Sequence, residues 1–190
     1  MKKQSQITEI TKQNIVDSFW NLYKKKGIEH ISVKQVMDDA GYNRCTFYEY
    51  FTDIYDTLDY IENSLISYMK ANILEQNKDF TMNEFILNRI AFLYEEKGEY
   101  ISTLLSEKGD PAFSNKIKST LKPFIQANFS LPTDNKKADI IFEFTISGFI
   151  NTFSYWYNNK ESVSINDIIQ TIYSISSNGM FTEMQKIQKR

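Results

Sequence analysis

Apolar side chains recur along this chain three and four residues apart, which is the spacing of one face of an α-helix. The clearest stripe consists of Val33, Val36, Met37 and Ala40. The same spacing elsewhere predicts an all-α fold of about nine helices. We expect these helices at residues 8–26, 32–41, 43–51, 53–77, 82–96 and 100–107, from 111 to a break at 131–134, and at 134–159 and 165–187.

Helix ends are marked by a small number of residues. The chain has only six glycines and three prolines, which disfavours sheet folds that need a turn every 8–12 residues. Gly27 and Gly41 are predicted to end the first two helices. We expect Gly98 to interrupt the chain between two helices, and Pro123 to kink or break the helix that contains it.

Composition excludes several kinds of site. The single cysteine, Cys45, and the single histidine, His30, rule out an internal disulfide framework and a metal centre of the Cys/His type. No Gly-rich phosphate loop and no paired nucleophile and base are visible, so we expect no enzyme, no metal and no cofactor. The first residues lack an apolar signal segment, and no run of 18 apolar residues predicts a membrane helix. A cytoplasmic protein is therefore expected.

Charge is distributed unevenly along the chain. The net charge is −2, but residues 1–46 carry eight Lys and Arg against five acidic residues. The other 144 residues carry 14 Lys and Arg against 19 acidic residues. This difference indicates a basic head on an acidic body, as expected for a protein whose head contacts nucleic acid.

Two short predicted helices meet at Gly41, which is typical of a helix-turn-helix. The second carries Phe47 and Phe51 on one face and polar side chains on the others. Such a helix is held by its aromatic face while its polar face enters a major groove. Arg44 carries the guanidinium that matches guanine, and Asn43 the amide that suits adenine.

The residues around this turn resemble the signature of the TetR (tetracycline-repressor-like) transcriptional regulators. The matching positions are Ser32, Val33, Val36, Ala40, Gly41, Asn43, Thr46, Phe47, Tyr48 and Phe51. Three positions depart from that signature. Cys45 replaces a Gly, Ala or Ser, Tyr50 replaces a His, and Ile54 replaces a Lys. Two later phrases, Lys108-Gly-Asp-Pro-Ala-Phe113 and Ser147-Gly-Phe-Ile with Tyr155-Trp156, resemble a subfamily of these regulators more loosely.

The resemblance implies a helix-turn-helix DNA-binding domain at residues 1–52 and a helical ligand-binding and dimerisation domain at 53–190. The helix at 53–77 would link the two. Tyrosine hydroxyls and a helix N-terminus at Ser32 suit phosphate. The expected DNA contacts are Ser32, Val33, Lys34, Asn43, Arg44, Cys45, Thr46, Phe47, Tyr48 and Tyr50.

The resemblance also implies a homodimer formed by the last two helices, which are both strongly apolar. The expected interface residues are Phe142, Ile146, Phe149, Ile150, Phe153, Trp156, Ile168, Ile169, Ile172 and Tyr173, with Gly148 permitting close approach. Members of the family commonly bind a small molecule in the helical body. Aromatic residues that would line a site for an apolar or aromatic ligand are Phe92, Tyr100, Phe113, Phe124 and Phe149.

The favoured hypothesis is a ligand-responsive repressor that binds a palindromic DNA operator as a homodimer, with two recognition helices roughly 34–36 Å apart. The near-neutral total charge keeps a second hypothesis open, in which the chain is a helical adaptor that binds protein and not DNA. Binding to DNA at low salt distinguishes the two. An enzyme is the least favoured class.

Overall fold

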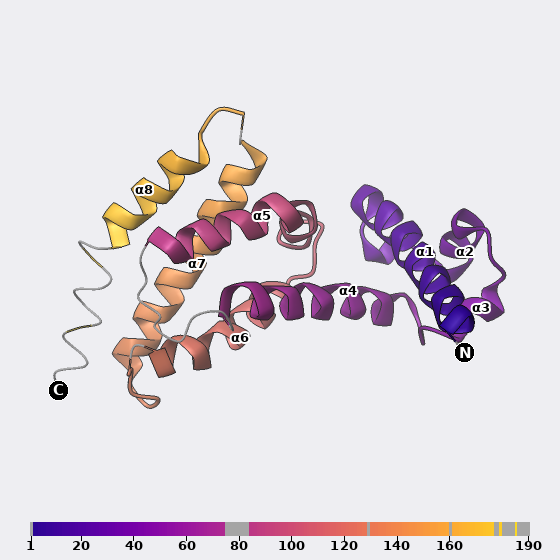
Figure 1. Ribbon diagram of the computed structural model, residues 1–190, viewed down its shortest axis with the longest axis horizontal. Helices are drawn as coiled ribbons and strands as arrows, with labels where there is room; N and C mark the ends of the chain where they lie inside the picture. Colours follow the sequence, from indigo (N-terminus) through magenta and orange to yellow (C-terminus); the bar gives the residue numbers. More distant parts are fainter. Residues whose placement is uncertain are drawn as a thin grey trace. The chain divides into compact units, whose positions relative to one another are not determined.

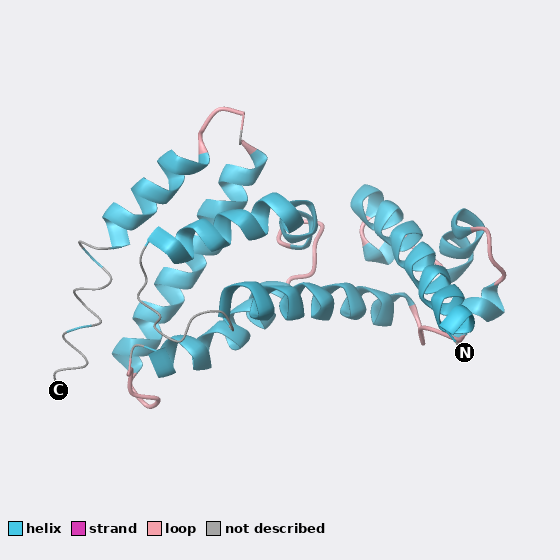
Figure 2. Cartoon of the chain, viewed as in Figure 1, coloured by secondary structure: helices cyan, strands magenta, loops and turns pink. Residues whose placement is uncertain are grey.

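Helices joined by loops make up the part of the chain that the structure describes (Figures 1 and 2). The computed structural model describes residues 2–74, 84–128, 130–159 and 161–176, together with residues 179 and 185. Two compact units divide the chain, Met1–Ser64 and Leu65–Arg190, and the boundary between them lies within helix α4.

The first unit is built on one long helix and two short ones. Helix α1 (Lys2–Lys26) ends at Gly27, and the short 3-10 helix η1 (Ile28–His30) follows it. Helices α2 (Val33–Ala40) and α3 (Arg44–Tyr48) come next, and α4 (Ile54–Met69) begins in this unit. Helix α1 packs against α2, and α2 packs against α3. The buried side chains include Phe19, Val36, Met37 and Phe47, which form the apolar interior of this unit.

The two short helices have well-defined ends. Ser32 caps α2: its Oγ accepts a hydrogen bond from Gln35 N (3.3 Å), and Gln35 Oε1 accepts one from Ser32 N (3.0 Å). Gly41 ends α2 with a φ of 76°, a left-handed conformation that costs a glycine little and other residues more. The predicted start and end of the second helix are thus confirmed.

The second unit is a bundle of helices. The π-helical segment η2 (Lys70–Leu74) continues α4, and α5 (Glu84–Leu104), α6 (Phe113–Asn128), α7 (Lys136–Asn158) and α8 (Ile165–Ile175) follow. Helix α5 packs against α7 and α8, and α6 packs against α7. One core cluster joins Ile125, Leu131, Phe142 and Ile146, so α6 and α7 share an apolar interior.

Neither Gly98 nor Pro123 breaks a helix, so the predicted break at Gly98 is wrong. Gly98 lies inside the continuous helix α5, so the described residues contain eight α-helices and not about nine. A Cβ at Gly98 would lie 2.3 Å from Tyr157 Cε2, which shows that this glycine permits a close approach and does not mark an end. Pro123 likewise lies inside α6, which runs on to Asn128.

Some of the expected helix ends lie outside the described residues. These are residues 75–77 of the fourth predicted helix, the start of the fifth at 82–83, and positions beyond 176 of the last, where only 179 and 185 are described. Within the described part, the predicted break at residues 131–134 is confirmed, since α7 begins only after Asn135.

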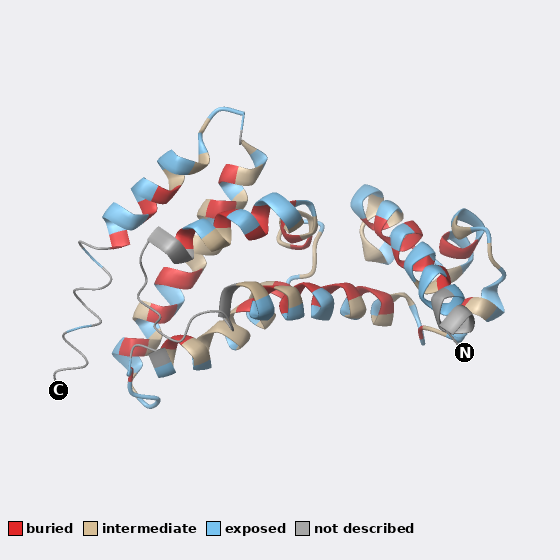
Figure 3. Ribbon diagram, viewed as in Figure 1, coloured by how far each residue is buried: buried red, intermediate tan, exposed pale blue. Residues whose placement is uncertain are grey.

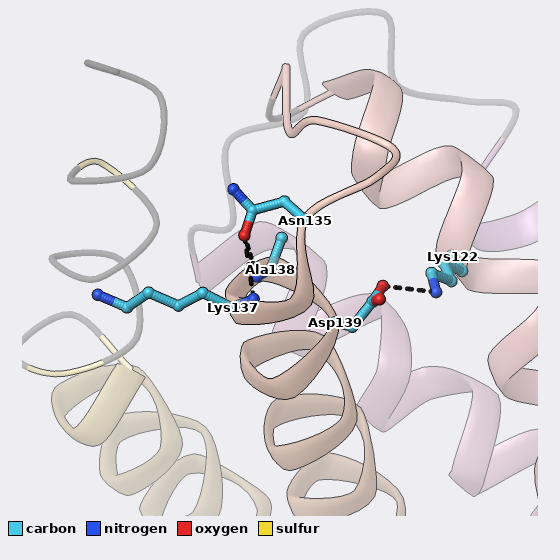
Figure 4. A network of polar contacts seen from close by, with 5 residues as sticks. All are labelled: Lys122, Asn135, Lys137, Ala138 and Asp139. Carbon is cyan, nitrogen blue, oxygen red and sulfur yellow. Dashed lines mark hydrogen bonds and ion pairs between the residues drawn. The ribbon is translucent and has the colours of Figure 1, made fainter.

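Polar contacts fix the start of α7 (Figure 4). Asn135 Oδ1 accepts hydrogen bonds from the backbone N–H groups of Lys137 (3.0 Å) and Ala138 (3.2 Å). Lys122 Nζ lies 2.8 Å from Asp139 Oδ1, and it also stands over the Phe142 ring at 5.8 Å. The hydrogen bond from Lys122 lowers the pKa of Asp139. Helix α6 is therefore tied to the first turns of α7.

Burial follows the helical stripes along both units (Figure 3).

No helix among the described residues is long and apolar enough to span a membrane. The described residues also contain no group of three or more His, Cys, Asp and Glu side chains arranged to hold a metal ion.

Candidate nucleic-acid interface

Helix α3 separates its buried side chain from its exposed ones. Phe47 is 0% exposed, whereas Tyr48 is 58% exposed, and Arg44 and Cys45 are also exposed. A helix of five residues is too short to be stable alone, so burial of Phe47 is what holds it. Phe47, one of the predicted DNA contacts, therefore has no surface with which to meet a ligand, and its role is to anchor α3.

Asn43 begins α3 as its N-cap. Its Oδ1 accepts hydrogen bonds from Thr46 N (3.0 Å) and from Thr46 Oγ1 (3.3 Å). Bidentate pairing with adenine requires the oxygen and the nitrogen of the amide together. Because this oxygen already accepts two hydrogen bonds, the arrangement suits Asn43 to capping the helix better than to recognising a base.

The other predicted contacts lie near these positions on α2 and α3. Ser32 and Lys34 are exposed at the start of α2, and Val33 is half-buried beside them. Tyr50 is half-buried directly after α3. The sequence prediction thus identified a set of mostly exposed side chains on two adjoining helices, together with the buried anchor Phe47.

Further contacts hold this pair of helices to α1 and α4, and the sequence pattern did not indicate them. Asn14 Nδ2 on α1 donates a hydrogen bond of 2.9 Å to the Tyr42 hydroxyl, directly after Gly41. Lys12 Nζ lies 3.8 Å from the centre of the Tyr60 ring and 5.5 Å from that of Phe51. Both contacts join residues far apart in the sequence, which periodicity cannot show.

The net charge of the N-terminal part of the chain changes sign between residue 46 and residue 64. Residues 1–46 are net positive, but the compact unit Met1–Ser64 carries eight Lys and Arg against ten acidic residues, which makes it net negative. Asp53 and Asp56 near the start of α4 contribute to this reversal. They bond locally, because Asp53 Oδ1 accepts from Asp56 N (2.9 Å) and Asp56 Oδ2 from Thr52 N (2.8 Å). Attraction of DNA by this unit would therefore depend on local cations such as Lys34 and Arg44, and not on the net charge of the unit.

In the second unit, most of the predicted dimer contacts lie inside one copy of the chain. The residues of that set that are buried within the chain are Phe142, Ile146, Phe153, Trp156, Ile169 and Ile172. Phe149, Ile150 and Ile168 are half-buried, and Tyr173 is exposed. Buried side chains already fill the protomer interior, so they offer no surface to a second copy.

A different face of α7 is apolar and exposed. Phe144 is 81% exposed and Ile140 is 69% exposed, and Tyr155 lies exposed on the same helical face. Gly148 also falls on this face, and a Cβ there would meet nothing within 4 Å. We call Ile140, Phe144, Gly148 and Tyr155 the outer α7 stripe. It is an apolar surface that a single chain leaves uncovered.

The second unit is also the part of the chain that matches a known family. Residues 81–178, just over half of the chain, match the TetR-type family described as "Transcriptional regulator C-terminal region". The chain belongs to the TetR family of transcriptional regulators. TetR-family regulators bind DNA and are generally not enzymes. No curated protein matches the chain.

Solved structures of other regulators share this fold. A TetR transcriptional regulator from Streptococcus agalactiae 2603V superposes with a TM-score of 0.69 at 23% identity, covering 92% of this chain and 97% of the other. A TetR-family transcriptional regulator from Streptomyces coelicolor gives 0.59 at 14% identity, covering 93% and 90%. The "Dihydroxyacetone kinase operon activator DhaS" gives 0.57 at 16% identity, covering 94% and 98%.

In this TetR-family chain, the aromatic residues predicted to line a ligand site occupy unlike environments. Phe113 is 1% exposed, Tyr100, Phe124 and Phe149 are half-buried, and Phe92 on α5 is 47% exposed. Phe124 packs against the cluster that contains Phe142. Phe92 therefore presents a large part of its ring to the surface, unlike the other four.

Proposed function

We propose that this chain is a cytoplasmic, ligand-responsive transcriptional repressor that binds a palindromic DNA operator as a homodimer. The observation that carries the proposal is the division of α3 into the buried anchor Phe47 and the exposed residues Arg44, Cys45 and Tyr48. A short helix that is held at one side and exposed at the other is what major-groove recognition requires. Membership of the TetR family supports the same conclusion.

Each exposed residue has a role that its chemistry suits. Arg44 would donate to O6 and N7 of a guanine, and Tyr48 would donate its hydroxyl to a phosphate. Lys34 at the start of α2 would neutralise a further phosphate. Asn43 and Phe47 would position α3 without contacting a base. Asn43 Oδ1 already accepts a hydrogen bond from Thr46 N, and Phe47 is buried.

Dimerisation is proposed through α7 and α8, with the outer α7 stripe at its centre. Its support is the exposed apolar surface of Ile140, Phe144 and Tyr155, and the open space at Gly148, where a second helix could approach closely. A two-fold interface brings the same patch of both copies together, so each exposed side chain contributes twice.

The response to a small apolar or aromatic ligand rests on family membership and on the aromatic content of the second unit. The half-buried Tyr100, Phe124 and Phe149 remain the proposed lining residues, whereas Phe113, at 1% exposed, has no free surface for a ligand. Phe92 is dropped from this proposed set because nearly half of its side-chain surface is exposed. Repression is proposed over activation on the family resemblance, and a reporter gene placed behind the bound DNA would show which occurs.

A DNA-binding titration tests the central proposal. The probe is the DNA duplex upstream of the chain's own gene, and an unrelated duplex of equal length is the comparison. We expect tighter binding to the first duplex, with log K falling by about 0.9 per phosphate contact for each tenfold rise in salt. Absence of binding at low salt would contradict the proposal and favour the protein-binding adaptor.

Replacement of Arg44 tests the assigned contact. Arg44→Ala is expected to weaken binding to the upstream duplex by about 1–3 kcal/mol and to change binding to the unrelated duplex much less. Lys25→Ala is the matched control, because Lys25 is an exposed cation at the end of α1. Equal losses for Arg44→Ala on both duplexes would mean that Arg44 contacts phosphate and not a base.

A further inference from the structure

Three aromatic rings contact one another in succession between α3 and α4. The ring centres of Phe47 and Phe51 are 5.7 Å apart, and those of Phe51 and Tyr60 are 5.6 Å apart. Phe47 is the buried anchor of α3, Phe51 follows α3, and Tyr60 lies on α4. Movement of either helix would therefore disturb a ring contact with the other.

One cation from a third helix stands over two of these rings. Lys12 on α1 is half-buried, with its Nζ 3.8 Å from the centre of Tyr60 and 5.5 Å from the centre of Phe51. Both distances lie within the range of about 6 Å in which a ring attracts a cation. Lys12 thus joins α1 to the residue after α3 and to α4 at once.

Helix α1 holds the other end of the α2–α3 pair in a different way. Asn14, two residues after Lys12, donates to the Tyr42 hydroxyl in the turn before α3. Helix α3 is therefore held at its anchor, before its first residue and after its last, and two of these three attachments come from α1. The orientation of so short a helix depends on such attachments because it has little stability of its own.

We propose that Lys12 is a positioning residue for sequence-specific DNA binding, which fixes the orientation of α3 through its contacts with Phe51 and Tyr60. This inference rests on the proposed function. It assigns to Lys12 no contact with DNA, so its charge should not appear among the cations that neutralise phosphate. A phosphate-binding lysine would instead contribute to the salt dependence of binding and would act on every DNA sequence alike.

The experiment compares Lys12→Met and Lys12→Arg in the full chain. The probe is a duplex that the wild-type protein enriches from a random-sequence pool, and a shuffled duplex measures non-specific binding. We expect Lys12→Met to weaken binding to the enriched duplex about fivefold, with unchanged salt slope and unchanged binding to the shuffled duplex. Lys12→Arg retains a cation over the rings and should bind within about twofold of wild type.

Changes at Tyr60 complete the test. Tyr60→Phe keeps the ring and should bind like wild type, whereas Tyr60→Leu should lose as much as Lys12→Met, and the double variant should lose no more than either. Unchanged specific binding by Lys12→Met would overturn the inference, as would a salt slope reduced by about 0.9, which marks a phosphate contact. If the wild type enriches no sequence, the proposed function itself fails, and the inference with it.

Discussion

At the scale of single residues, the second unit contains a tyrosine hydroxyl buried between helices. Tyr94 on α5 lies 3.0 Å from Ser154 Oγ and donates to the Ile150 carbonyl at 3.3 Å, both on α7. Its ring stacks on Phe153 with centres 5.6 Å apart. Burial raises the pKa of Tyr94 to about 12, although the hydrogen bond with Ser154 lowers it. The folded chain therefore resists ionisation of this group.

Replacement of Tyr94 should change how stability depends on pH. The unfolded state ionises this tyrosine above a pKa of about 10 and the folded state only near 12, so the wild type should lose about 1.4 kcal/mol from this group between pH 7 and pH 11. Tyr94→Phe lacks that loss, but it should cost about 1 kcal/mol at pH 7 because hydrogen bonds are removed. Urea denaturation at both pH values checks this.

The two stability values should thus converge as the pH rises. Tyr55→Phe, at an exposed tyrosine of α4, is the control for loss of a phenol. A gap between wild type and Tyr94→Phe that stays constant from pH 7 to pH 11 would show that burial of Tyr94 contributes nothing to the pH dependence.

Residue roles were predictable where they depend on near neighbours in sequence. Ser32 as a cap and Gly41 as a helix end follow from local backbone requirements, and the structure has both. The capping role of Asn43 is equally local, but the sequence predicts only a base contact for this residue, and the hydrogen bonds to Thr46 reveal the cap. The role of Lys12 could not be predicted from the sequence, because its partners Phe51 and Tyr60 lie about 40 and 50 residues away along the chain.

At the scale of elements, α5 and α7 approach each other closely at Gly98. A Cβ at this position would lie 2.3 Å, 2.4 Å and 2.9 Å from three atoms of the Tyr157 ring. Glycine inside a helix costs roughly 1 kcal/mol relative to alanine. The chain bears this cost where the Tyr157 ring lies against the backbone of α5.

Whether a substitution at Gly98 raises or lowers the free energy of unfolding should depend on Tyr157. Gly98→Ala gains helix propensity but forces the ring to move, which costs about 1–3 kcal/mol, so the free energy of unfolding should fall or stay level. In a Tyr157→Ala background the clash is absent, and the same change should stabilise by roughly 1 kcal/mol. Urea denaturation of the four variants measures the difference. Stabilisation by Gly98→Ala in both backgrounds would contradict the contact.

The positions of the helices were predictable from the sequence. Where a helix is interrupted, and which of its faces is buried, were less predictable. Apolar spacing located every described α-helix, although it divided α5 in two, because burial of one face leaves a period in the sequence. The sequence predicts a break at Gly98 and a kink or break at Pro123, but both helices run on, since either residue is tolerated inside a helix that tertiary contacts hold. On α7 apolar residues occupy both faces, and the pattern alone could not show which face meets the protomer core.

At the scale of the whole molecule, the proposed dimer depends on the outer α7 stripe. A partner copy would bury Phe144 and Ile140 twice over, at about 1.5–3 kcal/mol for each large apolar side chain. The buried residues Phe142 and Phe153 lie on the other side of α7 and hold it against its own chain. One helix would thus contribute to the protomer core and to the subunit interface by separate faces.

Introduction of charge on this stripe should separate the subunits. Phe144→Asp loses apolar burial on both sides of the interface, so the dimer dissociation constant should rise by about 100-fold or more. Analytical ultracentrifugation over a concentration series measures it. Ile10→Asp is the matched control, because it places the same charge on an exposed apolar position of α1. A Phe144→Asp variant that remains dimeric at wild-type concentrations would move the interface elsewhere.

The separation of roles within α3 has a consequence for how such a protein can change over time. Phe47 and the Asn43 cap maintain the helix, whereas Arg44, Cys45 and Tyr48 are exposed. The Tyr48 ring also meets the Phe47 ring edge-on, with ring centres 5.6 Å apart. Mutations at the exposed positions, with an aromatic ring kept in place of Tyr48, can therefore accumulate at little cost in stability. Duplicated copies of the gene could acquire new operators while keeping the same fold, and the same three positions are where an engineer would begin to redirect the protein to a chosen DNA sequence.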